Sequence, residues 1–181
     1  ARYGLRFFVA DYHVLAGGSA PSPYRDWVPA LGTLAQGETP SALPRGEPSP
    51  YRTYRVVSPG GTGAAAAFVR DPRSTLQVWS RDAGYPGDFA YLEFHKKHFP
   101  GGIRYWRVTD RFRDLGTKRV YDPRGAEDRS EAHARHFVAL VASTLAELDR
   151  RPALLCAPYD AELFGHWWFE GPVWLERVTQ G

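Results

Sequence analysis

Short apolar runs separated by turn residues dominate the first part of the chain, and they predict strands. Residues 4–12 (GLRFFVADY) and residues 64–69 form two such runs. Residues 103–109 (IRYWRVT) alternate apolar and polar positions as a strand does, and residues 153–159 (ALLCAPY) predict a further buried strand. A second apolar stretch covers residues 74–80.

The spacing of apolar residues becomes helical in the second half. Residues 123–150 predict one long helix, because Pro123 stands near its start and apolar side chains recur at helical spacing. Pro152 ends that pattern. Residues 162–178 predict a second helix or a loop followed by a helix, and residues 89–98 predict a short helix.

The order of these elements predicts the fold class. A strand, a long helix, a strand and a helix follow one another in the second half, as in parallel α/β units. Ligands bind such units at the carboxyl ends of the strands. Asp160 directly follows the strand predicted over residues 153–159, so it is a candidate catalytic residue.

Residues 19–63 differ from the rest of the chain. They are rich in proline and glycine and show little periodicity, which predicts a long irregular loop. A loop of this length is usually functional or disordered. Aromatic side chains such as Trp27 argue against a plain linker.

Composition mainly excludes classes of protein. The 181 residues are 43% hydrophobic and 24% charged, and no apolar run is long enough for a membrane helix. The net charge of +3 is scattered, which disfavours a nucleic-acid partner. Cys156 is the single cysteine, so no internal disulfide forms, and we expect an inert buried thiol. The chain lacks methionine and opens inside a predicted strand, so we expect an internal segment of a longer protein.

Most of the candidate catalytic and ligand-binding side chains lie in residues 159–172 (YDAELFGHWWFEGP). This stretch holds three carboxylates, one histidine and several aromatic rings. Aromatic rings stack on the apolar faces of sugars, and carboxylates act as acid, base or nucleophile at an acetal carbon. A structural aromatic cluster is an equal alternative. A metal site at Asp160, Glu162 and His166 is disfavoured, because their spacing matches no metal signature.

The run CAPYDAELFGHWWFEGPVWL resembles the fourth signature region of glycoside hydrolase family 57. Upstream, QVWSRDAGYPGDFAYLEFHKK, YWRVTD, DLGTKRVYDP and EAHARHFVALV are similar to the 1,4-α-glucan branching enzymes of that family. The resemblance spans residues 64–175 in sequence order, whereas residues 19–63 match poorly.

The resemblance implies a retaining transferase acting on α-glucan, with no metal or organic cofactor. Asp160 would be the general acid/base. The nucleophile would be a glutamate in a motif that this chain lacks, so we expect the chain alone to be inactive. An amylase or a 4-α-glucanotransferase of the same family remains an alternative, as does a non-catalytic glucan-binding fragment. A metal-dependent deacetylase is disfavoured.

The same resemblance implies an incomplete barrel of seven parallel strands, a (β/α)7 fold. Residues 1–181 would be part of the catalytic barrel domain, with residues 19–63 as a loop insertion. The early strands and a helical C-terminal domain would lie outside this chain. The resemblance also implies a cytoplasmic protein that forms glycogen, with no membrane partner.

Further site residues follow from the resemblance. Trp79 would line the donor pocket, with a core tryptophan as the alternative, and Tyr85 and Asp88 would shape its rim or form a structural turn. His166 and Trp167 would orient the sugar, and Glu162 would hold Asp160 or a neighbour in place. Tyr24 or Tyr51 would form the tip of a covering loop, and a packing or capping role is expected for His133 and His136.

Overall fold

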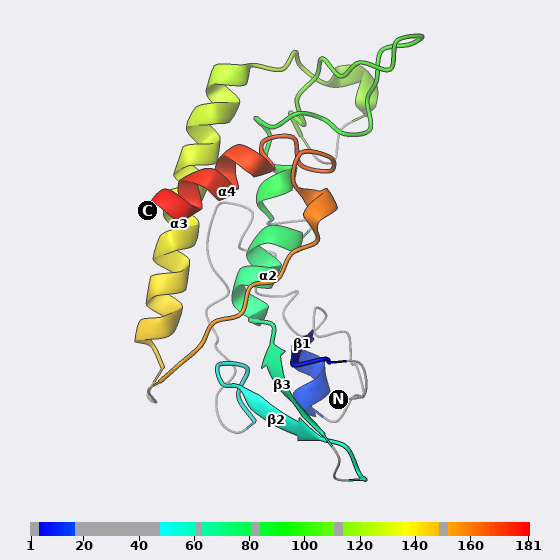
Figure 1. The fold of residues 1–181 in the computed structure, drawn as a ribbon. Helices are drawn as coiled ribbons and strands as arrows, with labels where there is room; N and C mark the ends of the chain where they lie inside the picture. Colours follow the sequence, from blue (N-terminus) through cyan, green and yellow to red (C-terminus); the bar gives the residue numbers. More distant parts are fainter. Residues whose placement is uncertain (1–3, 17–47, 61–62, 81–83, 111–113, 149–151) are drawn as a thin grey trace. The chain divides into compact units, whose positions relative to one another are not determined.

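The computed structural model describes residues 4–16, 48–60, 63–80, 84–110, 114–148 and 152–181 (Figure 1). Two compact units divide the chain. One contains residues 1–75 and 141–158, and the other contains residues 76–140 and 159–181. The predicted α/β class is confirmed, because both strands and helices are present.

A three-stranded mixed sheet belongs to the first unit. Its strands are β1 (Phe7–Ala10), β2 (Tyr54–Val57) and β3 (Ala64–Val69), in the order β1-β3-β2. β1 runs parallel to β3 and β2 runs antiparallel to it. No barrel of parallel strands is closed within the residues that the structure describes.

The strand predictions near the sheet hold in part. The strand expected over residues 4–12 is β1, followed by the 3₁₀ turn η1 (Tyr12–Ala16), but Phe7 is 59% exposed rather than buried. The prediction that residues 19–63 are irregular is wrong at β2, which lies inside that range. The sequence of β2 is aromatic and β-branched, which suits a strand. Its backbone groups bond to β3, and the proline-rich sequence around β2 gives no sign of this pairing.

Asp71 fixes the start of α2 (Pro72–Trp79) in the first unit. Its Oδ2 accepts a hydrogen bond from the Ser74 backbone N–H at 2.7 Å, which caps the helix, and its Oδ1 accepts one from the Tyr51 hydroxyl at 2.8 Å. Burial and the neighbouring Asp71 carboxylate both raise the pKa of Tyr51, so Tyr51 remains a neutral donor.

Tyr51→Phe should therefore destabilise the first unit. The change keeps the ring and removes one buried hydrogen bond, so we expect a loss of about 1–2 kcal/mol in the free energy of unfolding. Urea unfolding of the two forms measures it. Tyr54→Phe is the control, because the Tyr54 hydroxyl bonds only partly buried backbone groups of Ser49. An equal loss in both variants would contradict a special role for the Tyr51–Asp71 pair.

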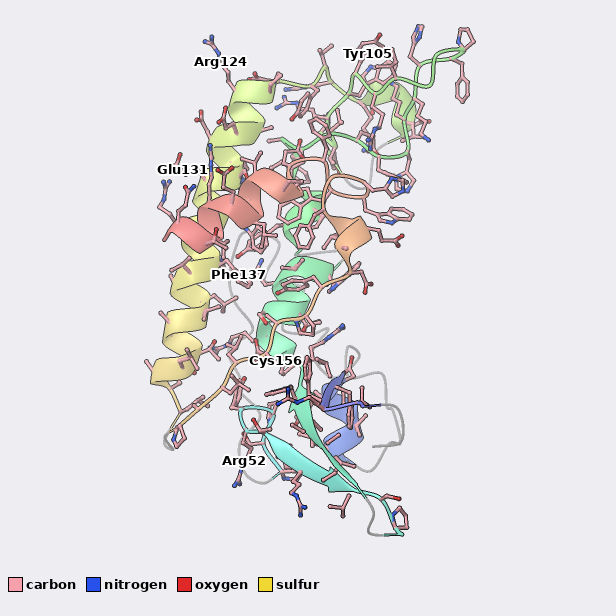
Figure 2. The ribbon with its side chains drawn as sticks, viewed as in Figure 1. Arg52, Tyr105, Arg124, Glu131, Phe137 and Cys156 are labelled. Atoms are coloured by element: carbon pink, nitrogen blue, oxygen red, sulfur yellow. The ribbon has the colours of Figure 1, made fainter. Side chains whose placement is uncertain are left out.

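The second unit contains α3 (Pro123–Ala146) as far as Leu140, and α4 (Gly171–Gln180). The long helix is confirmed, although it ends at Ala146 rather than at residue 150. Phe137 lies on α3 (Figure 2). Its ring is edge-to-face with that of Trp174 on α4, with ring centroids 5.0 Å apart. Trp168 packs against the same tryptophan, at 5.1 Å between centroids. These buried rings form the aromatic core of this unit.

Residues 89–98 form turns, bends and isolated bridges and no helix, so the prediction of a helix there is wrong. Their backbone groups bond to a distant part of the chain: the Glu93 N–H donates to the Trp106 carbonyl, and the Val108 N–H donates to the Tyr91 carbonyl, both at 2.8 Å. The strand predicted over residues 103–109 is present only as isolated bridges. Local sequence pattern carries no information about such long-range pairing.

Residues 153–159 also fall short of the predicted strand. One parallel bridge joins Arg70 to Cys156, and the Asp71 N–H donates to the Cys156 carbonyl at 2.7 Å. Figure 2 places Cys156 on this extended segment. Its thiol is half-buried, and burial raises its pKa, which agrees with an unreactive cysteine. Among the described residues, no helix has the length and apolar character needed to cross a membrane.

Candidate functional site

Asp160 begins the turn that carries the candidate site. It is the N-cap residue of the 3₁₀ turn η5 (Ala161–Leu163), and its carbonyl accepts the Leu163 N–H at 3.1 Å. The side chain is exposed and makes no capping hydrogen bond. Within the described part of the chain its carboxylate has no hydrogen-bond or ion-pair partner. It is therefore open to exchange a proton with a bound molecule.

The segment after η5 folds back on itself, with Leu163 and Trp168 buried and residues 165–167 between them exposed. The Trp168 N–H donates to the Leu163 carbonyl and the Gly165 N–H donates to the Trp168 carbonyl, both at 2.8 Å. Gly165 has φ +86°, and a Cβ on Gly171 would lie 2.9 Å from the Phe164 ring, so both positions require glycine. Leu163 and Trp168 are buried anchors, which leaves neighbouring polar and aromatic side chains exposed.

Glu162, His166 and Trp167 are brought together on the exposed side of this segment. The Trp167 indole N–H donates to Glu162 Oε1 at 3.3 Å. The His166 ring lies 5.5 Å from the Trp167 ring, nearly perpendicular to it. The arrangement presents a carboxylate, an imidazole and an indole on the turn that Asp160 begins, and these groups can bind a polyhydroxylated ligand.

Tyr85 lies in the aromatic core, not at an exposed rim. It is 3% exposed, its hydroxyl hydrogen-bonds His136 Nδ1 at 2.6 Å, and its ring stacks on His133 at 4.5 Å. Burial, with a smaller contribution from Tyr159, raises the pKa of Tyr85 far above its ordinary value. This placement favours the structural alternative for Tyr85.

Asp88 is held by two partners on α3. Its Oδ2 accepts a hydrogen bond from Arg129 Nε at 2.8 Å and lies 3.6 Å from His133 Nε2. The other nitrogen of His133 hydrogen-bonds the Tyr91 hydroxyl at 2.8 Å. Both α3 histidines therefore make packing contacts of the kind expected for them.

The remaining candidates belong to other segments of the chain. Trp79 lies at the end of α2 and is 38% exposed. Tyr51 is buried against Asp71, which does not suit the tip of a mobile loop. Tyr24 lies outside the described residues. In the described part of the chain, no group of three or more histidine, cysteine, aspartate or glutamate side chains is placed to hold a metal ion.

Phe94, Arg104 and Glu170 contact this region, and the sequence analysis did not single them out. Phe94 stacks on Trp167, Arg104 Nη1 donates to the His166 carbonyl at 3.4 Å, and Glu170 Oε1 accepts the Leu92 N–H at 3.0 Å. Burial raises the pKa of Glu170, against the effects of Tyr121 and the Leu92 N–H. Glu170 could have been noticed as a carboxylate inside an aromatic run. Phe94 and Arg104 carry no such signal.

Curated relatives resemble the chain over nearly its whole length. A 1,4-alpha-glucan branching enzyme of Thermococcus kodakarensis is 40% identical over 98% of this chain, which corresponds to 24% of the relative. A probable 1,4-alpha-glucan branching enzyme of Mycobacterium tuberculosis is 41% identical over 74% of the chain and 26% of its own length. The chain thus spans about a quarter of these relatives. No family model matches it.

Solved structures agree with the sequence relatives. The crystal structure of the Thermococcus branching enzyme, of the family 57 type and in complex with glucose and additives, matches 98% of this chain with a TM-score of 0.76 and 40% identity. The chain is a homologue of the glycoside hydrolase family 57 branching enzymes. It covers 30% of that crystal structure.

Two further solved structures resemble the chain. A family 57-type branching enzyme from Pyrococcus horikoshii matches 98% of this chain, with a TM-score of 0.73 and 36% identity. The match covers 27% of the Pyrococcus chain. The α-amylase AmyC of Thermotoga maritima matches 99% of the chain and 33% of its own, with a TM-score of 0.67 and 29% identity. The structures that resemble this chain therefore include an α-amylase as well as branching enzymes.

Proposed function

We propose that the protein carrying these residues is a retaining 1,4-α-glucan branching enzyme, a glycosyltransferase of glycogen synthesis. The observation that carries the proposal is the 40% identity to a branching enzyme over 98% of the chain. The exposed Asp160 carboxylate supports it, together with the exposed Trp167 indole, which hydrogen-bonds Glu162 of the turn that Asp160 begins. In the same proposal the segment forms part of an incomplete (β/α)7 barrel, and a glutamate from outside these residues is the nucleophile.

The proposed reaction has two displacements at the same sugar carbon. In the first, the glutamate attacks C1 of the donor glucan while protonated Asp160 gives its proton to the departing 4-oxygen, so the C1–O bond breaks and a glycosyl–enzyme ester forms. In the second, a 6-hydroxyl of an acceptor glucan attacks C1, Asp160 takes the hydroxyl proton, and the ester bond breaks. The products are a shortened donor and a new α-1,6 branch. Two carboxylates about 5–5.5 Å apart perform this chemistry in retaining enzymes.

Hydrolysis is the second candidate, because an α-amylase matches 99% of the chain. Water would then replace the 6-hydroxyl in the second displacement. A 4-α-glucanotransferase would instead use a 4-hydroxyl, and the chain alone could serve only to bind glucan. These reactions differ in their products, which gives a direct test.

The purified protein that carries these 181 residues, with its intact mass recorded, should be incubated with amylose and its products counted. We expect iodine absorbance to fall, reducing ends to stay constant, and new α-1,6 linkages to be released by a debranching enzyme. A rise in reducing ends that matches the iodine loss would establish hydrolysis and overturn the proposal. A fall in iodine absorbance with neither new reducing ends nor new α-1,6 linkages would establish α-1,4 transfer, which would also overturn the proposal.

A further inference from the structure

The exposed Trp167 indole rests on a support that lies far from it in the sequence. The Trp167 and Phe94 rings stack at 4.3 Å between centroids with 30° between their planes. The Arg104 guanidinium lies over the same Phe94 ring, with its carbon 5.6 Å from the centroid. Arg104 also reaches the His166 carbonyl at 3.4 Å. Phe94 therefore contacts both the indole and a cation that is itself bonded to the site segment.

The edge of the indole is fixed as well. Its N–H donates to Glu162 Oε1 at 3.3 Å, and the Glu162 carbonyl accepts the Trp167 backbone N–H at 3.4 Å. Glu162 belongs to η5, which Asp160 begins. Phe94 thus contacts the indole ring, and Glu162, a residue of the turn that Asp160 begins, holds the edge of the indole.

The remaining surface of Trp167 is open. The residue is 45% exposed although the Phe94 ring stacks on it and the His166 ring lies 5.5 Å away, so the indole surface that these two rings leave uncovered is accessible to a ligand. A flat aromatic surface binds the apolar C–H face of a pyranose ring. An indole that is held before the ligand arrives loses little conformational freedom on binding, which strengthens the complex.

We propose that the open face of Trp167 is a subsite for one glucosyl ring of an α-glucan, and that Phe94 is its positioning residue. Arg104 and Glu162 complete the support. The proposal rests on the proposed function, because it takes the α-glucan as the ligand. It goes beyond that function by assigning the rigidity of the subsite to the Phe94 stack, not to Trp167 alone.

Phe94→Leu in the full protein tests the proposal. The change keeps an apolar side chain and removes the stack, so the indole becomes mobile. We expect the KM for amylose to rise about threefold to tenfold while kcat changes by less than about twofold, as for loss of uniform binding. The affinity for maltoheptaose, measured by tryptophan fluorescence in an Asp160→Asn background, should weaken by the same factor. Phe94→Tyr, which keeps the stack, should retain both values.

Phe89→Leu is the matched control. Phe89 lies in the same segment and is 51% exposed, and the chemical change is identical. Equal effects of Phe89→Leu and Phe94→Leu would overturn the subsite, and so would a fall in kcat at constant KM for Phe94→Leu. If the wild type hydrolyses amylose but its maltoheptaose affinity depends on Phe94, the branching proposal fails and the subsite stands. If the wild type branches amylose and Phe94→Leu leaves KM and affinity unchanged, only the subsite fails.

Discussion

Asp160→Asn abolishes most of the transferase activity of the full protein if Asp160 is the acid/base. The expected loss in kcat/KM on amylose is about 10²- to 10⁴-fold, the usual contribution of general acid–base catalysis. An amide has nearly the shape of a carboxyl group but can neither give a proton to the 4-oxygen nor take one from the acceptor hydroxyl. Initial rates of iodine loss, with reducing ends counted in parallel, measure the effect.

Stability should be unaffected by this change. The Asp160 side chain is exposed and makes no capping bond, so the free energy of unfolding should change by less than about 0.5 kcal/mol. Asp114→Asn is the matched control, since Asp114 is an exposed N-cap residue of another 3₁₀ turn, η4 (Leu115–Thr117), and asparagine can replace its bond to the Gly116 N–H. That variant should keep its activity within about twofold.

An activated donor separates an acid from a merely structural residue. A maltooligosaccharide with a good aryl leaving group needs no proton for departure, so Asp160→Asn should form the glycosyl–enzyme from it at a rate close to that of the wild type. The release of the aryl alcohol in a first burst measures this step. An equally large loss on amylose and on the aryl donor would contradict the assignment of Asp160 as the acid.

Parts of the candidate site could be predicted because their signal is local. The motif around Asp160 is contiguous, so its carboxylates and rings are visible in the sequence, and the structure does place Glu162 and Trp167 in contact. The helix from Pro123 could also be predicted, since helical spacing persists over many residues.

The rest could not be predicted because it depends on pairing between distant segments. The backbone of residues 89–98 forms hydrogen bonds with residues 106–109. Phe94 lies within this paired segment and stacks on Trp167. The interior position of Tyr85 arises in the same way, from contacts with the histidines of α3. Local periodicity gives neither the partner nor the burial of such residues.

Lys118→Met should strongly destabilise the second unit. The Lys118 ammonium is buried and donates to the Val108 and Asp110 carbonyls, both at 2.6 Å, and it lies 3.0 Å from Glu93 Oε2. Methionine fills similar space but leaves a buried carboxylate without its cation. Breaking a buried pair on one side costs about 3–5 kcal/mol in the free energy of unfolding.

Hydrogen exchange of a peptide covering residues 89–110 measures this loss locally, and urea unfolding measures it for the whole protein. Lys97→Met is the control, because that lysine is exposed and should change stability by less than about 0.5 kcal/mol. The double variant Glu93→Gln/Lys118→Met should be more stable than Lys118→Met alone, since it leaves no buried charge unpaired. A double variant that is less stable than Lys118→Met would contradict this account.

Acid should weaken the same pair. Burial by itself raises the pKa of Glu93, but hydrogen bonds from the His95 backbone and from Lys118 outweigh it and hold the pKa below its ordinary value of 4.5. Glu93 therefore binds fewer protons in the folded state than in the unfolded state between those two pKa values. Its contribution is complete above the ordinary value and disappears as the pH falls through the lowered one. Glu93→Gln should remove this part of the acid sensitivity, so equal slopes of stability against pH in wild type and variant would show that the pair is not its source.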